Sequence, residues 1–233
     1  HWSHIYAIET AHRMGIKVLL RGEANLHLES TSGIKTLAKA GFMRWLVSRT
    51  DQFLTIGSRN KKFYLQYGVA ATRLHHMPYA VDNGFFQAVS QEASRVREQF
   101  RSSVGLEAGR PIILYASKMT ERKRAGDLLE AYIRLSPDGQ KEPKPYLLFI
   151  GDGEMKSALK RRSAELGWGS IRFLGFKNQT ELPAFYDLCD VFVLPSFHEP
   201  WGLVINEVMN AAKPVIVSDH VGCAPDLVNH KGN

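Results

Sequence analysis

Cysteine is scarce in this chain of 233 residues, which contains only Cys189 and Cys223. Their spacing fits neither a metal site nor a redox pair, and such sparse use of cysteine is typical of a reducing compartment. No stretch approaches the ~18 consecutive apolar residues that a membrane-spanning helix needs. No secretory signal peptide is recognisable, and the first residue is His1 rather than methionine. These absences predict a cytoplasmic protein, present here as a fragment or a processed chain.

The rest of the composition is that of an ordinary globular protein. Hydrophobic residues make up 44% of the chain and charged residues 23%, which suits one or two domains. Lys and Arg outnumber Asp and Glu by 30 to 23, so the formal net charge is +7. That excess favours an anionic partner, such as a phosphate group, a nucleic acid or an acidic membrane surface. The nine histidines form no metal-binding pattern, and no G-x-S-x-G nucleophile elbow occurs.

Apolar runs and helical segments alternate along the chain. The apolar runs predict strands, beginning with a buried one at 17–20 and followed by 52–56, 74–78, 112–116, 146–150, 171–174, 191–194 and 214–217. Helices are predicted at 5–14, 34–48, 58–66, 90–105, 126–135, 155–166, 182–188 and 203–212. We expect Ser58 to cap the third helix and 136–145 to be a surface loop. This alternation predicts an α/β fold of doubly wound parallel sheets.

The polar helical stretch 90–105 separates two series of such elements. We place a domain boundary just before it, which gives a first domain of residues 1–88 and a second of residues 89–233. No internal repeat is seen beyond the alternation of strands and helices.

The most informative stretch runs from Leu194 to Glu207. It follows a predicted buried strand and leads into a predicted helix, with Glu199 in the loop and Glu207 inside the helix. Gly202 would let a bulky anion approach the backbone, and the first amides of the helix have no partner within it. The N-terminus of such a helix can bind an anion through these amides. The alternative is an ordinary βαβ crossover with solvated glutamates.

Two other loops follow predicted strands at the edge where open α/β sheets bind ligands. One contains Lys118 and Lys123, which would hold a diphosphate leaving group or simply belong to a solvated basic loop. The other begins Gly151-Asp152-Gly153. It is similar to part of a dinucleotide fingerprint, but position 156 is Lys, so the third glycine is missing.

The N-terminal half offers two weaker candidates. Arg21 and Glu23 follow the strand at 17–20 and would form either a structural ion pair or part of a cleft. The helix at 34–48 is basic, and we expect a solvated basic face above a core face. The alternative is that this basic helix attaches to an anionic lipid surface. The core face would contain Leu37, Phe42, Trp45 and Leu46.

These segments together resemble a known family. The string PSFHEPWGLVINEVM, with seven residues between Glu199 and Glu207, resembles the E-x7-E signature of retaining glycosyltransferases of family 4. SKMTERKR is similar to the family's Arg followed five positions later by Lys, with Lys118 in place of the Arg. The GDG turn resembles one that lines the family's nucleotide pocket. RFLGF, which includes Phe173 and Leu174, resembles the stretch that borders the base.

The resemblance covers nearly the whole chain and implies a fold. In this family two Rossmann-like doubly wound domains face a cleft, the GT-B architecture. Residues 1–88 are similar to the later part of the N-terminal, acceptor-side domain, which would be incomplete. Residues 89–233 are similar to most of the C-terminal, donor-binding domain without its last elements.

The resemblance also implies an activity. The protein would be a transferase (EC 2.4, hexosyltransferase-like) that moves a sugar from a nucleotide-sugar to a saccharide, lipid-linked or small-molecule acceptor, with retention, in glycan or glycolipid biosynthesis. Glu199 would contact the donor sugar and Glu207 the ribose. Lys118 and Lys123 would bind the diphosphate together with the amides of Gly202, Leu203 and Val204.

By the same resemblance, no metal or other cofactor would be required and no nucleic acid would bind. The enzyme would be cytoplasmic, with peripheral attachment to an anionic membrane as an option. Arg21 and Glu23 stand where the family often carries a His, so the acceptor-side contact is open. Two other classes of function remain. One is a nucleotide-cofactor oxidoreductase or methyltransferase that uses Gly151 and Gly153, and the other is a non-catalytic basic membrane-surface module.

Overall fold

A computed structural model describes residues 2–25, 33–135 and 144–229. The chain divides into two compact units. Unit 1 comprises residues 1–79 with 225–227, and unit 2 comprises residues 80–224 with 228–233. The predicted loop at 136–145 lies almost entirely outside the described residues. The predicted boundary between residues 88 and 89 falls inside helix α4 (Asn83–Arg95), which belongs whole to unit 2 because Phe86 is fully buried and α4 packs against α8 (Leu182–Leu188).

Unit 1 is built around a parallel sheet with strand order β1-β2-β3. Its elements are α1 (Trp2–Arg13), β1 (Leu19–Arg21), α2 (Ile34–Arg49), β2 (Gln52–Thr55), α3 (Ser58–Gln66), a 3-10 turn (Ala71–Arg73) and β3 (Leu74–His76). Phe53 in the central strand pairs in register with Leu20 and Leu74. Phe53 also packs with Tyr64 and Phe63 of α3 and with Met43 of α2 to form the core of this unit. The predicted helices and strands are therefore confirmed here, within two or three residues at their ends.

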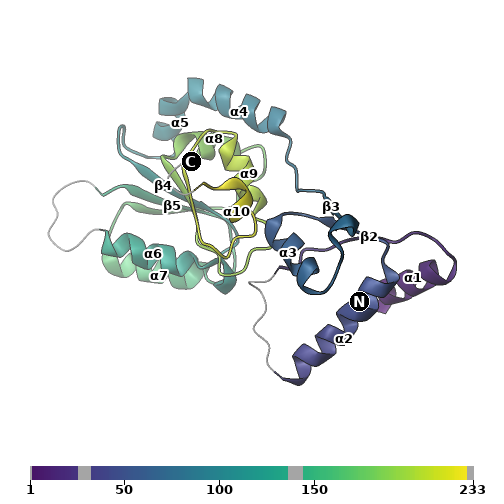
Figure 1. The fold of residues 1–233 in the computed structure, drawn as a ribbon. Coiled ribbons are helices and arrows are strands. Elements are labelled where there is room, and N and C mark those ends of the chain that lie inside the picture. Colours follow the sequence, from purple (N-terminus) through teal and green to yellow (C-terminus); the bar gives the residue numbers. More distant parts are fainter. Residues whose placement is uncertain (1, 26–32, 136–143, 230–233) are drawn as a thin grey trace. The chain divides into compact units, whose positions relative to one another are not determined.

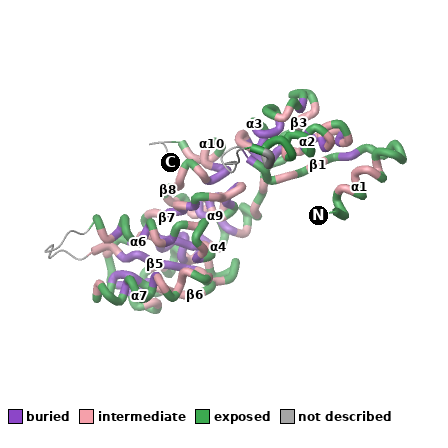
Figure 2. The backbone as a smooth tube through the Cα atoms, turned by 90° about the horizontal axis from the view of Figure 1, so that it is seen from below, coloured by how far each residue is buried: buried purple, intermediate pink, exposed green. Residues whose placement is uncertain are grey.

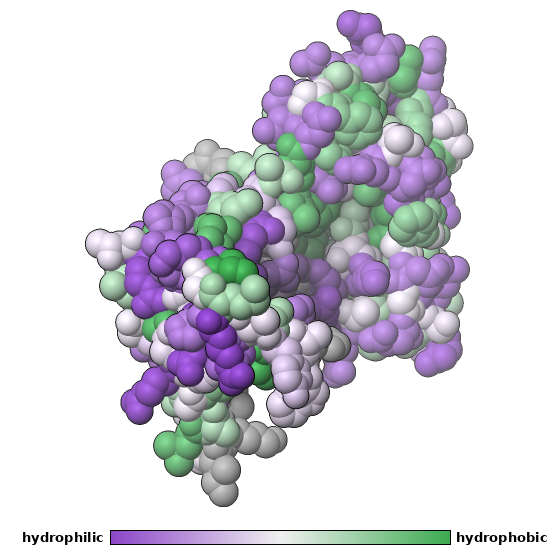
Figure 3. All heavy atoms as spheres, turned by 90° about the vertical axis from the view of Figure 1, so that its right-hand side faces the viewer, coloured by the Kyte–Doolittle hydropathy of each residue, from purple (hydrophilic) through white to green (hydrophobic). Residues whose placement is uncertain are grey.

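Three details of unit 1 differ from the predictions. The strand at 17–20 is not buried, because Leu19 is 58% exposed. Leu37 and Phe42 were assigned to the core face of α2 but are 74% and 45% exposed, whereas the buried side of that helix carries Met43 and Leu46. Helical geometry puts positions 43 and 46 on one face and position 37 on the other. Figure 3 shows hydrophobic atoms, in green, among hydrophilic ones on the face that it draws.

The third difference concerns the start of α3. The N-cap position of this helix is Gly57, and its first residue is Ser58, so the predicted Ser58 cap is wrong by one position.

Unit 2 is a doubly wound α/β layer structure (Figure 1). Its sheet is parallel throughout, in the order β6-β5-β4-β7-β8, with strands β4 (Ile112–Ala116), β5 (Tyr146–Ile150), β6 (Ile171–Gly175), β7 (Val191–Leu194) and β8 (Val215–Val217). Helices α6 (Ala125–Arg134) and α7 (Lys156–Leu166) cover one face. The other face carries α4, α5 (Arg97–Ser103), α8 and α9 (Leu203–Met209). The short helix α10 (Ala224–Leu227) follows β8 in the chain, but its residues 225–227 belong to unit 1.

The core of unit 2 explains why its strands could be predicted from the sequence. Every residue of β5 is buried, and the strand is purple in Figure 2. Helices cover both faces of the sheet that contains it (Figure 1). On one side Tyr115, Phe149 and Leu147 pack against Leu129 of α6 and Leu159 of α7. A strand buried on both faces needs an unbroken apolar sequence, which is the signal that predicted it. The helix predicted at 203–212 ends earlier, at Met209, and turns of the chain follow.

The order of the strands positions a binding edge. The chain builds β4, β5 and β6 outward in one direction and then returns to the other side of β4 for β7 and β8. Ligands of open α/β sheets bind at the carboxyl ends of the strands beside such a reversal. In this unit the reversal lies between β4 and β7.

No helix within the described residues is both long enough and apolar enough to cross a membrane.

Candidate functional site

A cavity of about 590 Å³ lies at the carboxyl edge of the unit 2 sheet. Its walls come from the loops after β4 and β5, the turn after β6, and one side of α8 and α9. Among the residues predicted from sequence, those that line it are Lys118, Gly151, Gly153, Val204 and Glu207. Residues from five separate segments of the chain thus line one cavity.

The two glycines of the GDG turn allow the loops after β4 and β5 to pack backbone against backbone. A Cβ on Gly151 would lie 2.1 Å from the Ser117 carbonyl oxygen, and one on Gly153 would lie 2.5 Å from that of Met119. Both glycines have positive φ, 127° and 149°. The Met119 amide donates to the Asp152 carbonyl at 2.8 Å, which locks the loops together. Only glycine fits both the conformation and the close approach.

Glu207 is held in the cavity wall by a tyrosine. The Tyr186 hydroxyl of α8 donates to Glu207 Oε2 of α9 at 2.7 Å. Burial raises the pKa of the Glu207 carboxyl, and the hydrogen bond from Tyr186 opposes that rise. The carboxylate is thus partly desolvated but paired, as expected for a group that accepts hydrogen bonds from a ligand.

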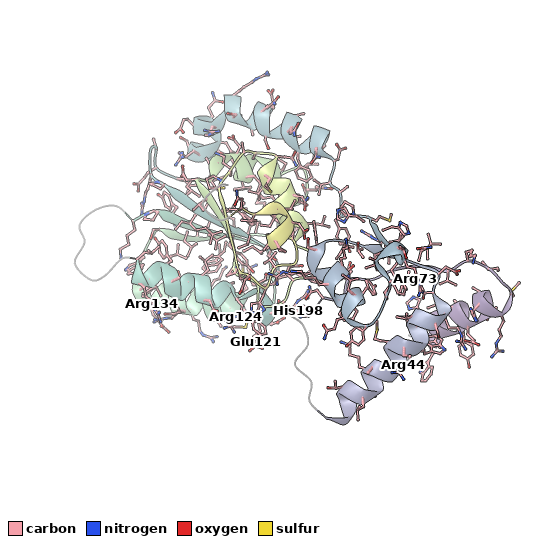
Figure 4. All side chains as sticks on the ribbon, in the orientation of Figure 1. Arg44, Arg73, Glu121, Arg124, Arg134 and His198 are labelled. Carbon is pink, nitrogen blue, oxygen red and sulfur yellow. The ribbon has the colours of Figure 1, made fainter. Side chains whose placement is uncertain are left out.

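Glu199 and Lys123 form a second feature at the same edge. The Lys123 ammonium contacts Glu199 Oε2, and their side chains are only 12% and 14% exposed. Burial, with Arg122 and Lys118 nearby, lowers the pKa of Lys123 to about 8, while the contact with the Glu199 carboxylate favours the charged form. Neither residue is part of the cavity wall. In Figure 4 the labelled Arg124, Glu121 and His198, their neighbours in sequence, gather at this end of the unit.

The loop between β7 and α9 is fixed by backbone contacts. Gly202, the N-cap residue of α9, has φ 98°, and a Cβ there would lie 2.9 Å from a Val221 methyl group. The Gly222 amide donates to the Glu199 carbonyl at 2.8 Å and the Cys223 amide to the Trp201 carbonyl at 2.9 Å. The helix start predicted near Gly202 is therefore confirmed. Leu203, which follows it, is 39% exposed and does not line the cavity.

The stretch 172–176, predicted to border the base, reaches the cavity through its last residue, Phe176. Phe173 stacks on Phe149 with ring centroids 5.0 Å apart, and Leu174 also stays within β6. Phe176, the last residue of the predicted stretch, and Lys177 come just after that strand and line the cavity. Side chains within a strand point to one face of the sheet or the other. Residues past the end of the strand are free of this constraint and can turn toward a site at the edge.

Sequence reasoning also missed Tyr186. It lies in an apolar helical segment, Leu182–Leu188, and is fully buried. A buried tyrosine normally needs a partner for its hydroxyl, which was the available signal.

Arg21 and Glu23 lie in unit 1, apart from the other candidates in the sequence. Both contact Tyr79: its hydroxyl donates to Glu23 Oε1, and the Arg21 guanidinium lies 4.4 Å from the centre of its ring. They form a local cluster at the end of β1. Among the described residues, no three His, Cys, Asp or Glu side chains converge to hold a metal ion.

The family described as "Glycosyl transferases group 1" matches residues 96–233, which is more than half of the chain and includes the whole site in unit 2. The chain belongs to this family. As a group 1 glycosyl transferase, it carries its strongest sequence features, the GDG turn and the two glutamates, inside the matched region.

Curated relatives match over part of their length. An uncharacterised glycosyltransferase of Methanocaldococcus jannaschii is 34% identical over 135 residues, which are 58% of this chain and 33% of that protein. The O-antigen chain mannosyltransferase B of Escherichia coli is 35% identical over 122 residues, covering 51% of this chain and 31% of its own. The group 1 glycosyl transferase chain thus spans about a third of the length of these relatives.

Among solved structures, Anabaena HepE in complex with UDP superposes with a TM-score of 0.74 at 20% identity. The match covers 96% of this chain and 59% of HepE. It extends over both units, and the structural neighbours are GT-B glycosyltransferases. The predicted GT-B class of fold is confirmed by this likeness, which at such identity concerns the fold alone.

Proposed function

We propose that this protein is a retaining glycosyltransferase of family 4, which moves a sugar from a nucleoside-diphosphate sugar to a saccharide, lipid-linked or small-molecule acceptor in glycan or glycolipid biosynthesis. One observation carries the proposal. Both glutamates of the E-x7-E motif occupy the carboxyl edge of the unit 2 sheet, Glu207 in the cavity wall and Glu199 in contact with Lys123. HepE, a structural neighbour, was solved with UDP, which supports a nucleotide as the ligand of this edge.

The roles follow from charge and position. In the cavity, which Gly151 and Gly153 also line, Glu207 accepts hydrogen bonds from the ribose hydroxyls. Lys118 in the cavity and Lys123 beside it are the cations for the diphosphate, aided by the amides at the start of α9, Gly202 to Val204. Backbone groups of the stretch 172–176, which includes Phe173 and Leu174, border the base, and Phe176 lines the cavity.

In the reaction, the bond from the anomeric carbon to the diphosphate oxygen breaks, and negative charge develops on the leaving phosphate. Lys118 and Lys123 stabilise that charge without a metal ion, because a fixed cation in a partly desolvated site is worth far more than one in water. Glu199 is released from Lys123 as the diphosphate binds, and it then accepts hydrogen bonds from sugar hydroxyls. The acceptor hydroxyl forms the new bond on the same face. The proton of that hydroxyl leaves with the phosphate.

The test is calorimetry followed by a transfer assay. Nucleoside diphosphates and their sugars are titrated into the purified protein, with the Glu207→Ala variant as the site control. Saturable binding that the variant loses is expected, and turnover should persist in EDTA. Binding that Glu207→Ala leaves unchanged would contradict the site assignment. Hydride transfer or methyl transfer with a bound cofactor would favour the alternative Rossmann-type enzyme instead.

A second proposal concerns location: a cytoplasmic enzyme that attaches to an anionic membrane through α2. Leu37 and Phe42 of that helix are exposed, and Arg44 is labelled on the same helix in Figure 4. However, Lys39 lies over the Phe63 ring and Arg49 pairs with Glu9, so the basic face is smaller than the sequence indicated. Flotation with vesicles that contain anionic phospholipid tests this. Binding should weaken for Arg44→Glu and for vesicles of neutral lipid.

On the acceptor side, we propose Arg21 and Glu23 as the first positions to examine. Their contacts with Tyr79 give them a defined geometry at a strand end. Tyr79→Phe should then alter the acceptor KM without altering the affinity for the nucleoside diphosphate, and an unchanged acceptor KM would argue against them.

A further inference from the structure

One contact in the cavity wall joins α8 to α9, which lie on the same face of the sheet. Tyr186 of α8 is fully buried, and its ring meets the ring of Phe192 in β7 edge to face, with centroids 6.2 Å apart. Its hydroxyl ends 2.7 Å from Glu207 Oε2. The position of that hydroxyl is therefore set by the packed sheet rather than by a loop.

In this arrangement the two oxygens of the Glu207 carboxylate have different partners. An ionised carboxylate accepts through two oxygens. Tyr186 occupies Oε2, which leaves Oε1 for a ligand hydroxyl in the cavity. A glutamate side chain has three rotatable bonds, so without such a contact its carboxylate would sample several positions, and binding would have to restrict them.

We propose that Tyr186 is a positioning residue for nucleotide binding, which fixes one carboxylate oxygen of Glu207 so that the other is presented to the ribose. The inference rests on the proposed function, because it takes the ribose role of Glu207 from there. Tyr186 itself does not touch the reacting atoms.

Electrostatics support the direction of the hydrogen bond. Burial and the neighbouring Glu207 carboxylate raise the pKa of Tyr186, so its hydroxyl stays protonated and always donates. Burial alone would raise the pKa of Glu207, and the Tyr186 hydrogen bond counteracts this by favouring the ionised form. Tyr186 therefore helps to keep Glu207 a pure acceptor near neutral pH.

Other titratable groups surround this pair. In the cavity wall, Asp152 pairs with Lys156 at 2.7 Å and Lys177 with Glu181 at 3.2 Å, so these charges are compensated locally. Cys189, at the end of α8, stays a neutral thiol because burial raises its pKa to about 12. The remaining groups of the wall are Lys118 and Glu154.

The test is Tyr186→Phe, which removes one oxygen atom and keeps the ring. Affinity for a nucleoside diphosphate such as UDP or GDP is measured by calorimetry from pH 5 to 8. We expect a loss on the order of tenfold at neutral pH, typical for a hydrogen bond to a charged group. We also expect the pH below which binding weakens to move upward, because Glu207 without its donor takes up a proton more readily.

A matched control is Tyr132→Phe. The Tyr132 hydroxyl is also buried in unit 2, where it donates to the Pro145 carbonyl at 2.6 Å and lies 2.8 Å from Ser170 Oγ, but it lies outside the cavity wall. This variant should lose stability without a change in affinity or in the pH profile. If both tyrosine variants behave alike, the effect at Tyr186 is merely structural and the inference is wrong.

Two outcomes separate this inference from the proposed function. If the wild type binds no nucleoside diphosphate, the proposed function fails and the inference fails with it. If the wild type and Tyr186→Phe bind with the same affinity and pH profile, the inference alone fails. Should Tyr186→Phe not fold, Glu207→Asp decides: the charge stays, but the shorter side chain withdraws from the tyrosine. Full affinity in Glu207→Asp would overturn the inference, and a loss as large as that of Glu207→Ala would support it.

Discussion

Replacement of Lys123 by alanine is the most direct probe of the site, because it removes one partner of a nearly buried ion pair. Lys123 and Glu199 are 12% and 14% exposed and come from loops after different strands, β4 and β7. The two loops are also joined by the Phe197 amide, which donates to the Arg122 carbonyl at 2.8 Å. The variant therefore leaves the Glu199 carboxylate in a poorly hydrated place without its cation.

The expected loss of stability follows from this burial. Breaking a buried pair by removing one partner costs ~3–5 kcal/mol, most of it the penalty of the uncompensated charge. Because some solvent reaches both side chains, we expect the lower end, about 3 kcal/mol. The double variant Lys123→Ala/Glu199→Gln should regain part of this loss, since it no longer buries a charge. Turnover should fall on the order of 10²-fold, as it does when one contact to developing charge is removed.

Chemical denaturation measures the first effect and a transfer assay the second. Arg162→Ala is the stability control, because its pair with Glu130 is about half exposed, 45% and 49%, and such pairs contribute ~0.2–1 kcal/mol. Lys39→Ala in unit 1 is the control for turnover. If Lys123→Ala and Arg162→Ala cost the same stability, and if Lys123→Ala and Lys39→Ala have the same turnover, the loop is a solvated basic face and our reasoning about the pair is refuted.

Three further predictions concern the same edge of the sheet. Glu207→Ala should weaken nucleoside diphosphate binding by ~1.5–3 kcal/mol, measured by calorimetry on a variant whose circular dichroism is unchanged. Gly151→Ala should destabilise unit 2 by at least ~2 kcal/mol in denaturant, because its φ is 127° and the new Cβ would meet the Ser117 carbonyl at 2.1 Å; Gly169→Ala, where nothing lies within 4 Å, should cost much less. Since burial lowers the pKa of Lys123 to about 8, the ammonium is lost above that pH, so diphosphate affinity should fall as the pH rises through about 8 in the wild type but not in Lys123→Ala. A flat profile in the wild type would show that Lys123 does not bind the diphosphate.

Much of the fold could be predicted from the sequence, because the signals are local. Strands β4, β5 and β7 have the predicted bounds, since strands buried on both faces must be unbroken apolar runs. The GDG turn and the helix start at Gly202 were also readable, because few residues other than glycine tolerate such backbone conformations. The parallel, doubly wound class followed from the alternation of these elements.

The surface of unit 1 was less predictable. Leu19, Leu37 and Phe42 are apolar, and their sequence alone placed them in a core, yet all three are exposed. Burial depends on which elements pack against a face. Residues on one strand or helix do not determine that.

The candidate site likewise has features that the sequence determined and contacts that only the tertiary structure decided. The sequence by itself determined which residues carry charge or lack a side chain at the ends of the strands: Glu199, Glu207, Lys123 and the glycines. Only the tertiary structure decided which of these side chains contact one another. Lys123 contacts Glu199, 76 positions away in the sequence, and Tyr186 contacts Glu207, 21 positions away. The physical reason is that backbone conformation depends on neighbours in the chain, whereas a contact between side chains depends on strand order and helix packing, which the whole core fixes together.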